Sequence, residues 1–331
     1  MAVLGITGGV LSAAVCLPGN PMNNFRYILL TAAKDEEACL GEVIEAVLRQ
    51  TVRPLAWFIM DDGSTDRTAT IVRKFAAEHP FIHLQSGDPR SGRCFGSQYK
   101  AINAAYALAG SLEFDFVAIQ DADQAPATEN YYQSLLEEFC NNPRLGAASG
   151  FVYERPAGIW EPRRDNARDS VAASAMFRKS CFDQIGGYTP LHYGGSDWLM
   201  QLNVRMAGWE VLTRPDLRLL HYRLTSSAGG IWRGKFRAGL MDASFGSHPL
   251  FELFKSGRRL TSHPFLFGSL LRLCGFFWWK LSGRKPLLAP EKVAFLRKEQ
   301  MAKLRGWMRP FGGTRAGKPI GVAVTKSPKT V

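Results

Sequence analysis

Acidic side chains stand in pairs where apolar segments of this sequence end. The clearest pair lies in 120-QDAD-123, where Asp121 and Asp123 follow the apolar run 114-FDFVAI-119. Two carboxylates this close repel each other unless a cation lies beside them. Carboxylate oxygens suit Mg²⁺ or Mn²⁺, which take one or two of them and complete their shell with water and substrate phosphates. The pattern predicts a divalent metal site, with a solvated turn as the alternative.

A second acidic turn, 61-DDGSTD-66, follows the apolar segment 55-LAWFIM-60. Asp61 or Asp62 could accept a hydrogen bond from a base or a ribose hydroxyl, as acidic residues at strand ends do in nucleotide-binding folds. The alternative is a turn that only begins a helix. Because both acidic motifs follow strands of one predicted sheet, together they favour nucleotide binding over two unrelated turns.

A third group of residues, 194-GGSDW-198, places Asp197 at the start of a predicted helix. A helix N-terminus favours a charged carboxylate, so Asp197 is either a general base or simply a first-turn acid. The adjacent Trp198 could form a wall for a sugar ring or an acceptor. His221 follows an apolar strand, and its imidazole either has a structural role or completes a metal site.

The elements that position these residues alternate between strands and helices. This alternation predicts an α/β fold with a mostly parallel sheet covered by helices on both faces. Ligands in such folds bind at the carboxyl ends of the strands, where both acidic motifs fall. The periodicity predicts strands at 26–33, 55–60, 81–85, 114–119, 146–154, 210–214 and 217–223, and helices at 38–50, 67–79, 97–110, 129–142 and within 193–209.

Composition excludes a disordered chain and argues against a nucleic-acid partner. The chain has 331 residues, 46% of them hydrophobic, and a formal net charge of +12. The basic charge is confined to the C-terminal part, which from Lys255 onward holds 17 Lys and Arg against 2 Glu, whereas residues 1–254 are mildly acidic. Six scattered cysteines without metal-ligand spacing indicate reduced thiols and a cytoplasmic location.

The segment 264-PFLFGSLLRLCGFFWWKL-281 is apolar and aromatic but carries two basic residues. It is too short and too charged for a stable membrane span. Its Trp278-Trp279 pair and the basic residues around it favour a helix at a lipid–water interface, drawn to anionic head groups. The alternative is a helical layer packed on the rest of the protein. We expect an N-terminal extension at 1–24, a globular domain at 25–225, a basic helical region at 226–309 and a flexible tail at 310–331.

Taken together and in this order, the motifs resemble those of family 2 glycosyltransferases, enzymes with the GT-A fold of nucleotide-diphospho-sugar transferases. The resemblance runs from about Tyr27 to Arg223, and the later segments are similar to a bacterial subset of these enzymes. No single motif is specific, whereas the set in register is. The matching segments are 31-TAAKDEE-37, 61-DDGSTDRT-68, 120-QDAD-123, 186-GGY-188, 194-GGSDW-198, 206-MAGW-209 and 221-HYR-223.

The resemblance implies metal-dependent, inverting transfer of a sugar from a nucleoside diphosphate sugar, with UDP favoured and GDP as the alternative. Asp123 and His221 would bind Mn²⁺ or Mg²⁺ on the diphosphate, and Asp197 would deprotonate an acceptor hydroxyl. The acceptor would be a saccharide or a lipid-linked saccharide, in exopolysaccharide or cell-envelope synthesis at the inner face of the cytoplasmic membrane. The remaining implied donor contacts are Thr31, Ala33, Glu36, Asp61, Asp62, Asp121, Ala122 and Trp198.

Several departures from the family pattern bear on these expectations. The first motif lacks the Pro and Asn that often precede Glu36, and Ser196 stands before Asp197 where Glu is common. The sequence after His221 lacks a clear QxxRW pattern, which argues against a processive synthase. Two other functions remain as alternatives: a sugar-phosphate nucleotidyltransferase, for which 31-TAAKDEE-37 lacks a Gly-rich basic signature, and a non-catalytic module that binds nucleotide sugars or membranes.

Overall fold

The computed structural model describes residues 25–87, 95–163, 166–191, 194–223, 230–260 and 265–308. The predicted N-terminal extension and C-terminal tail lie outside these residues. The described strands form one mixed sheet of nine strands in the order β3-β2-β1-β4-β8-β6-β9-β5, with β7 paired to β6. The strands are β1 (Tyr27–Ala33), β2 (Ala56–Asp61), β3 (Ile82–Ser86), β4 (Phe116–Ile119), β5 (Gln124–Pro126), β6 (Leu145–Glu154), β7 (Glu161–Pro162), β8 (Met176–Arg178) and β9 (Glu210–His221).

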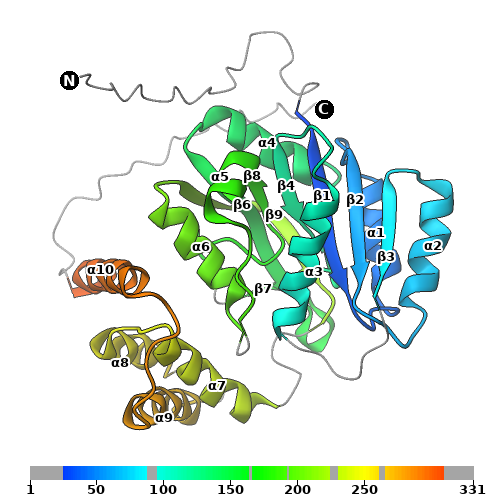
Figure 1. Ribbon diagram of the computed structural model, residues 1–331. Helices are drawn as coiled ribbons and strands as arrows, with labels where there is room; N and C mark the ends of the chain where they lie inside the picture. The colour runs from blue at the N-terminus through cyan, green and yellow to red at the C-terminus, as the bar shows by residue number, and fades with distance from the viewer. Residues whose placement is uncertain are drawn as a thin grey trace, which may run out of the picture.

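Helices cover both faces of the sheet, which confirms the predicted fold class (Figure 1). The first four strands in chain order pair in parallel, as predicted, whereas β5, β7 and β8 add antiparallel pairs. One face carries α1 (Leu40–Leu48), α2 (Thr68–Glu78) and α4 (Tyr131–Asn141), and the other carries α3 (Phe95–Leu108), α5 (Lys179–Ile185) and α6 (Ser196–Met206).

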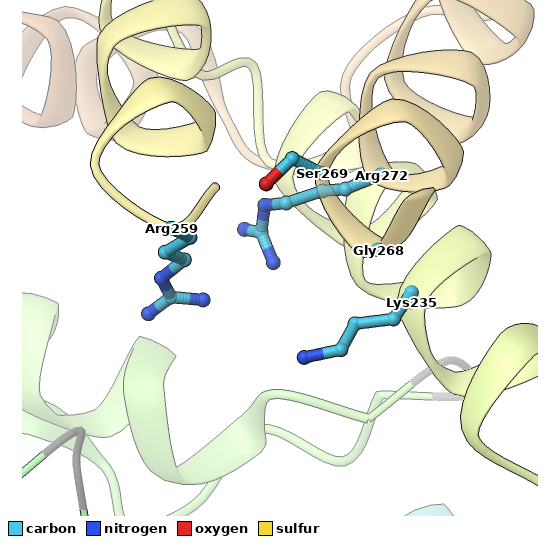
Figure 2. Close-up of a pocket in the computed structure, with 5 residues that line it drawn as sticks. All are labelled: Lys235, Arg259, Gly268, Ser269 and Arg272. Carbon is cyan, nitrogen blue, oxygen red and sulfur yellow. The ribbon is translucent and has the colours of Figure 1, made fainter. Parts of the chain in front are cut away.

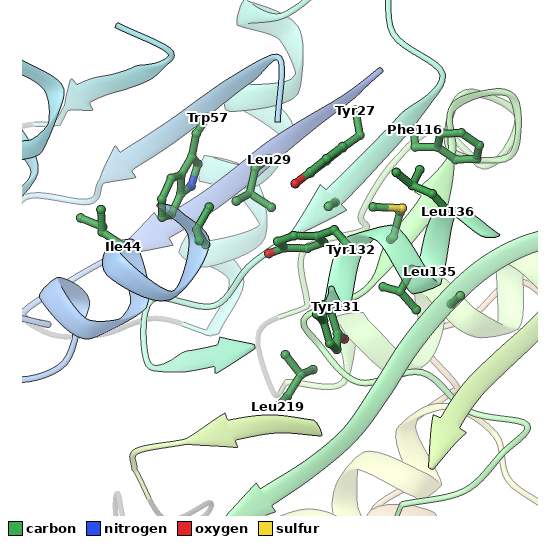
Figure 3. Close-up of a cluster of buried hydrophobic side chains, with 14 of the residues drawn as sticks. Tyr27, Leu29, Ile44, Trp57, Phe116, Tyr131, Tyr132, Leu135, Leu136 and Leu219 are labelled. Atoms are coloured by element: carbon green, nitrogen blue, oxygen red, sulfur yellow. The ribbon is translucent and has the colours of Figure 1, made fainter. Parts of the chain in front are cut away.

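Strand β1 shows why the central strands of this sheet have continuous apolar sequences. Successive side chains of a strand point to opposite faces, and here both faces are covered. Tyr27 and Leu29 pack under α1 and α4, as Figure 3 shows, while Ile28 and Leu30 pack under α3. The indole of the buried Trp57 in β2 donates a hydrogen bond to Thr31 Oγ1 at 2.9 Å, so its one polar group is satisfied.

Strand β9 corrects one prediction from the sequence. We predicted two strands, 210–214 and 217–223, because Pro215 cannot donate a hydrogen bond within a sheet. The structure has one strand, β9, that pairs in parallel with β6 along its length. Its register shifts where Gly150 pairs with Arg214 and the next residue of β6 pairs with Arg218, so the proline lies in a bulge. A Cβ on Gly150 would lie 2.5 Å from the carbonyl oxygen of Leu217, which explains the glycine.

Four further helices form a layer beside α6, below it in Figure 1. They are α7 (Ile231–Ser244), α8 (Pro249–Gly257), α9 (Phe267–Leu281) and α10 (Pro290–Met308). Arg205 of α6 pairs with Glu299 of α10 at 2.8 Å, and apolar side chains of α6, α7 and α10 share one cluster. Helices α7 and α9 cross at very short range, because a Cβ on Gly275 would lie 2.1 Å from the carbonyl oxygen of Phe236. The layer is therefore packed on the α/β part of the chain.

The segment predicted to lie at a lipid–water interface forms α9. Its two tryptophans differ, since Trp278 is 49% exposed whereas Trp279 is 4% exposed and packs against α7. Of the two basic residues within the helix, Arg272 is buried in ion pairs with Asp242 and Glu252. No helix among the described residues is long and apolar enough to cross a membrane.

Candidate active site

The predicted acidic residues gather at the carboxyl ends of β1, β2 and β4. Ala33 ends β1 and pairs with Asp61, which ends β2, so the first and second motifs lie side by side. The amide of Gln120 donates to the carbonyl of Leu30 in β1, which extends the pairing of β1 and β4 up to the third motif. The parallel register therefore brings the three motifs together, although the second lies about 30 residues after the first and the third about 60 residues after the second.

Asp121 and Asp123 have opposite electrostatic environments. Asp121 accepts hydrogen bonds from the neutral amides of Gln98 at 3.1 Å and Gln124 at 2.9 Å. Burial and the neighbouring Asp123 raise the pKa of Asp121 to about 7. Burial also acts to raise the pKa of Asp123, but the hydrogen bond and charge of His221 outweigh it and lower that pKa below its usual value. Asp123 is therefore the carboxylate that stays ionised.

His221 is held between two carboxylates. Its Nε2 lies 3.3 Å from Asp123 Oδ2, and its Nδ1 lies 3.2 Å from Glu154 Oε1. Strand pairing sets this arrangement, because His221 at the end of β9 pairs with Glu154 of β6 on one side and Gln124 of β5 on the other. Burial acts to lower the pKa of His221, but the two carboxylates raise it above its usual value.

Glu154 was missed by the sequence analysis. It ends the apolar strand 146-GAASGFVYE-154, and an acid at that point is the only signal the sequence offers. An ionised carboxylate only accepts hydrogen bonds, so the contact with Glu154 keeps a proton on Nδ1 of His221. The other ring nitrogen, Nε2, faces Asp123 and would give up its proton to bind a metal ion. Glu154 is thus a positioning residue for the imidazole.

The donors present at this point match a divalent ion that is shared with a substrate. Among the described residues, no three His, Cys, Asp or Glu side chains form a complete metal-binding group. Asp123 and His221 supply one carboxylate oxygen and one imidazole nitrogen on facing sides, 3.3 Å apart. Mg²⁺ and related ions commonly take one or two protein ligands and fill the remaining positions with water and phosphate oxygens. This pair of donors fits that mode of binding.

Arg223 supplies a cation to the same cluster. Its Nη2 forms an ion pair with Glu36, and its Nε lies 3.9 Å from Asp123 Oδ2. Glu36 is 7% exposed and its amide donates to Thr68 Oγ1 at 2.8 Å, so the carboxylate is fixed beside α2. The segment 221–223 therefore brings both cations of the site to carboxylates that come from other strands.

The turn after β2 is braced by hydrogen bonds of its own and of the first motif. Asp61 Oδ1 accepts the amide of Ser64 at 2.9 Å, and Lys34 Nζ donates to the carbonyl of Asp62 at 3.0 Å. Asp61 is 5% exposed, whereas Asp62 is partly exposed. Of the two candidates for a nucleoside contact, Asp62 is therefore the more accessible.

Besides Glu36 and Asp61, three more of the predicted donor contacts have buried side chains. Thr31 is fully buried, and its hydroxyl donates to the carbonyl of Gln120 at 2.7 Å while it accepts from Trp57. Ala33 and Ala122 are 2% and 4% exposed. The Thr31 hydroxyl links three strands and is already satisfied, so the predicted contact between this side chain and a ligand is not what the structure favours.

Asp197 lies in the first turn of α6, as predicted, after two glycines that both have φ of 88°. Its surroundings include Tyr99 and Tyr188, whose rings stack with centroids 4.8 Å apart. Burial raises the pKa of both tyrosines, and the charges of Asp197 and Asp121 raise it further. Asp197 and Asp121 therefore act on the same pair of rings, and the site extends from the metal donors to Asp197. The sequence analysis assigned no role to Tyr99 or Tyr188.

Trp198, expected to form a wall for a sugar ring or an acceptor, packs against the helical layer. Its indole stacks on Phe245 with ring centroids 4.8 Å apart and an angle of 4° between the planes. Phe245 follows α7, so the contact fixes the helical layer to α6. The preceding Gly195 makes room for it, since a Cβ there would lie 2.8 Å from Met241 Sδ and from Phe245.

Comparisons with known proteins agree with this geometry. Residues 29–199, slightly more than half of the chain, match the sequence model of glycosyl transferase family 2. The poly-beta-1,6-N-acetyl-D-glucosamine synthase of Staphylococcus aureus (strain COL) is 27% identical over 121 residues, which cover 37% of this chain and 27% of the synthase. The match thus spans about a quarter of that relative's length.

Two solved structures share the fold at low sequence identity. The S. aureus TarS 1-349 complex with UDP-GlcNAc has a TM-score of 0.50 and 12% identity, over 82% of this chain and 78% of TarS. GalNAc-T7 with UDP, GalNAc and Mn²⁺ has a TM-score of 0.51 and 12% identity, over 85% of this chain and 58% of that protein.

Proposed function

The chain belongs to glycosyl transferase family 2 and is a glycosyltransferase, and from that premise we propose which reaction its site performs. The donor is a nucleoside diphosphate sugar, with UDP favoured over GDP. The acceptor is a hydroxyl of a saccharide or a lipid-linked saccharide, and the transfer inverts the anomeric carbon. The observation that carries the proposal is the grouping of Asp123, His221 and Asp197 around Asp121 at the carboxyl edge of the sheet.

Asp123 and His221 would hold Mn²⁺ or Mg²⁺ between the protein and the donor diphosphate. The fit rests on one carboxylate and one imidazole that face each other at 3.3 Å. A bound divalent ion would stabilise the charge that develops on the nucleoside diphosphate leaving group. Arg223, 3.9 Å from Asp123, lies close enough to add positive charge near the same phosphates. Asp121 would stay hydrogen-bonded to the side-chain amides of Gln98 and Gln124, next to the metal ligands.

Asp197 would act as the general base. Its backbone position at the N-terminus of α6 favours the ionised carboxylate. Asp197 would take the proton from the acceptor hydroxyl as the oxygen attacks the anomeric carbon, on the face opposite the leaving group. The stacked Tyr99 and Tyr188 lie near both Asp197 and Asp121, where they would exclude water from the reacting atoms.

The nucleoside would bind at the ends of β1 and β2. We propose that Glu36, Asp61 and Asp62 contact the base and ribose, and that Ala33, Thr31 and Ala122 contribute through their backbone. Asp62 is the most accessible of the three acids. UDP is favoured over GDP in this proposal because TarS and GalNAc-T7, which share the fold, are described with UDP-GlcNAc and with UDP.

The acceptor and setting are proposed from the family's relatives and from the helical layer. The S. aureus relative is, by its name, a synthase of poly-beta-1,6-N-acetyl-D-glucosamine, which supports a polysaccharide acceptor in exopolysaccharide or cell-envelope synthesis. The exposed aromatic side chains of α9, with the exposed Arg284 and Lys285 that follow it, support contact with an anionic membrane surface at the inner face of the cytoplasmic membrane. A lipid-linked acceptor would then lie near the site.

A thermal-shift panel of UDP, GDP, CDP and dTDP with Mn²⁺ tests the donor and the metal ligand. A ligand at about 100 times its dissociation constant stabilises the folded state by about 2.7 kcal/mol. We expect a Mn²⁺-dependent rise in Tm with UDP that Asp123→Ala abolishes. Glu113→Ala is the matched control, because Glu113 is an exposed carboxylate before β4, at the opposite end of that strand.

Each outcome of this panel is informative. Absence of any nucleotide-dependent shift in the folded wild-type protein would refute the nucleoside diphosphate donor. An equal Mn²⁺-dependent shift in wild type and Asp123→Ala would refute Asp123 as the ligand. A larger shift with GDP than with UDP would replace the proposed donor base.

A further inference from the structure

The helical layer holds a buried cluster of charges that the transfer reaction does not use. Arg272 of α9 forms ion pairs with Asp242 of α7 and Glu252 of α8, and it is 6% exposed. Lys255 of α8 also reaches Asp242, with 3.1 Å between Nζ and Oδ2. Glu252 is fully buried, and its Oε2 has no hydrogen-bond partner among the described residues. The three helices thus meet around a charged centre.

A pocket opens from this centre to the surface between α7, α8 and α9. It is an open hollow of about 250 Å³ that includes solvent space, and its enclosed part has room for little more than one water molecule, so a phosphate group would bind at its mouth. Its lining is strongly basic, since Lys235, Arg259 and Arg272 contribute to it together with Gly268 and Ser269 of the first turn of α9. Figure 2 shows the charged ends of the three basic side chains directed toward one common space.

The charges around the pocket do not balance. Lys235, Lys255, Arg259 and Arg272 are basic, and the acids that pair with Lys255 and Arg272 are Asp242 and Glu252. Within this set of six described residues, positive charges outnumber negative ones. The first turn of α9 adds the positive end of a 15-residue helix. An anion with one or two charges would offset this excess, and phosphate suits arginine because it accepts paired N–H donors.

Large exposed apolar side chains flank the pocket residues Arg259, Gly268 and Ser269 in the sequence. Phe265, Leu266 and Phe267 are 62%, 62% and 64% exposed, and Leu270 in the next turn of α9 is 57% exposed. Leu260, beside Arg259, is also exposed, and its carbonyl accepts the amide of Leu266 at 3.0 Å. Exposed apolar side chains next to a basic anion site have the amphipathic character of surfaces that enter a lipid–water interface.

We propose that this pocket binds the phosphate of an anionic membrane lipid, while the apolar side chains of Leu260, Phe265, Leu266, Phe267 and Leu270 enter the interface beside it. A soluble phosphate would satisfy the charges but would leave the apolar rim exposed to water, so a lipid phosphate fits both features. The proposal deepens the membrane contact in the proposed function. Lipid binding is measured without the transfer reaction, so either proposal can be refuted while the other is retained.

Vesicle sedimentation measures this binding directly. Full-length protein is mixed with vesicles of phosphatidylcholine alone or of phosphatidylcholine with about one third phosphatidylglycerol. The test variant is Lys235→Gln with Arg259→Gln, which spares the buried Arg272. The matched control is Arg73→Gln with Lys74→Gln, which removes two exposed charges from α2, outside the helical layer.

We expect strong binding of the wild type to the phosphatidylglycerol vesicles only. The pocket variant should bind roughly 20- to 30-fold more weakly, as expected for two basic residues near an anionic surface. The α2 control should bind within about twofold of the wild type. A second variant, Phe267→Ser, should also weaken binding to these vesicles while its response to added phosphate stays unchanged.

Three outcomes would overturn the inference. Equal losses in the pocket variant and the α2 control would show that net charge alone attracts the protein. Unchanged binding of the pocket variant would show that the pocket is not involved. A thermal shift with inorganic phosphate that is lost in the pocket variant, without any pocket-dependent vesicle binding, would identify a soluble phosphate as the ligand and refute a lipid.

Discussion

Glu154 offers the sharpest test of how this site is built, because it touches His221 but lies behind it. Its Oε1 is 3.2 Å from His221 Nδ1, and pairing of β6 with β9 sets the two residues directly opposite each other. Glu154→Ala removes the acceptor, so the imidazole is free to rotate and to move its proton between the two nitrogens. Glu154→Gln keeps an acceptor of similar size but removes the charge.

The size of the effect follows from the contact and its burial. A hydrogen bond to a charged group contributes about 1.5–3 kcal/mol, and both side chains here are largely shielded, at 17% and 11% exposed. That range corresponds to a loss of about 10- to 100-fold in metal affinity, which is also typical when the partner of a metal-binding histidine is removed. We expect Glu154→Ala to weaken metal binding by close to 100-fold and Glu154→Gln to weaken it less.

Calorimetric titration of Mn²⁺ in the presence of UDP measures this affinity. The matched control is Glu161→Ala, since Glu161 pairs with Glu154 across β6 and β7 and is exposed to solvent. The control should bind Mn²⁺ as the wild type does. If Glu154→Ala also retained wild-type affinity while remaining folded, the reasoning that Glu154 orients His221 for a metal would be wrong.

Asp197→Asn should lower the transfer rate by about 100-fold or more and leave the Mn²⁺-dependent Tm shift with UDP unchanged, because a general base acts on the acceptor; lost UDP binding would contradict this role. Arg223→Gln should lower the free energy of unfolding by about 1–2 kcal/mol in chemical denaturation, because it leaves the buried Glu36 without its cation; unchanged stability would show that the pair is neutral. Gly275→Ala should lower the stability of the protein by about 3 kcal/mol in thermal unfolding, because the added Cβ would lie 2.1 Å from the carbonyl oxygen of Phe236. The control Gly306→Ala in α10, where the added Cβ has open space, should leave stability unchanged or raise it by up to about 1 kcal/mol. Equal effects of the two substitutions would contradict the close crossing of α7 and α9.

The local parts of the site were predictable from sequence because they depend on neighbouring residues. Asp121 and Asp123 follow a buried strand, and that order alone places them at the carboxyl edge of a parallel sheet. The role of Glu154 was not predictable, since it depends on which strand pairs with β9 and in which register. The direction of Trp198 was not predictable either, because a helix that begins about 30 residues later supplies the ring it stacks on. The periodicity of apolar residues indicates which side chains are buried, but it does not indicate which element each of them packs against.

The same distinction explains the charges of the site. The carboxylates come from the ends of β1, β4 and β6, whereas both cations, His221 and Arg223, come from the end of β9 and the residue pair after it. Without β9 these acids would lie together uncompensated, at a cost that grows with burial. Pairing of β9 with β6 therefore has two effects, since it joins β5 to the rest of the sheet and it brings two cations to the acids of the site. The proline bulge and Gly150 let this strand run its full length, so that its last residue reaches Asp123.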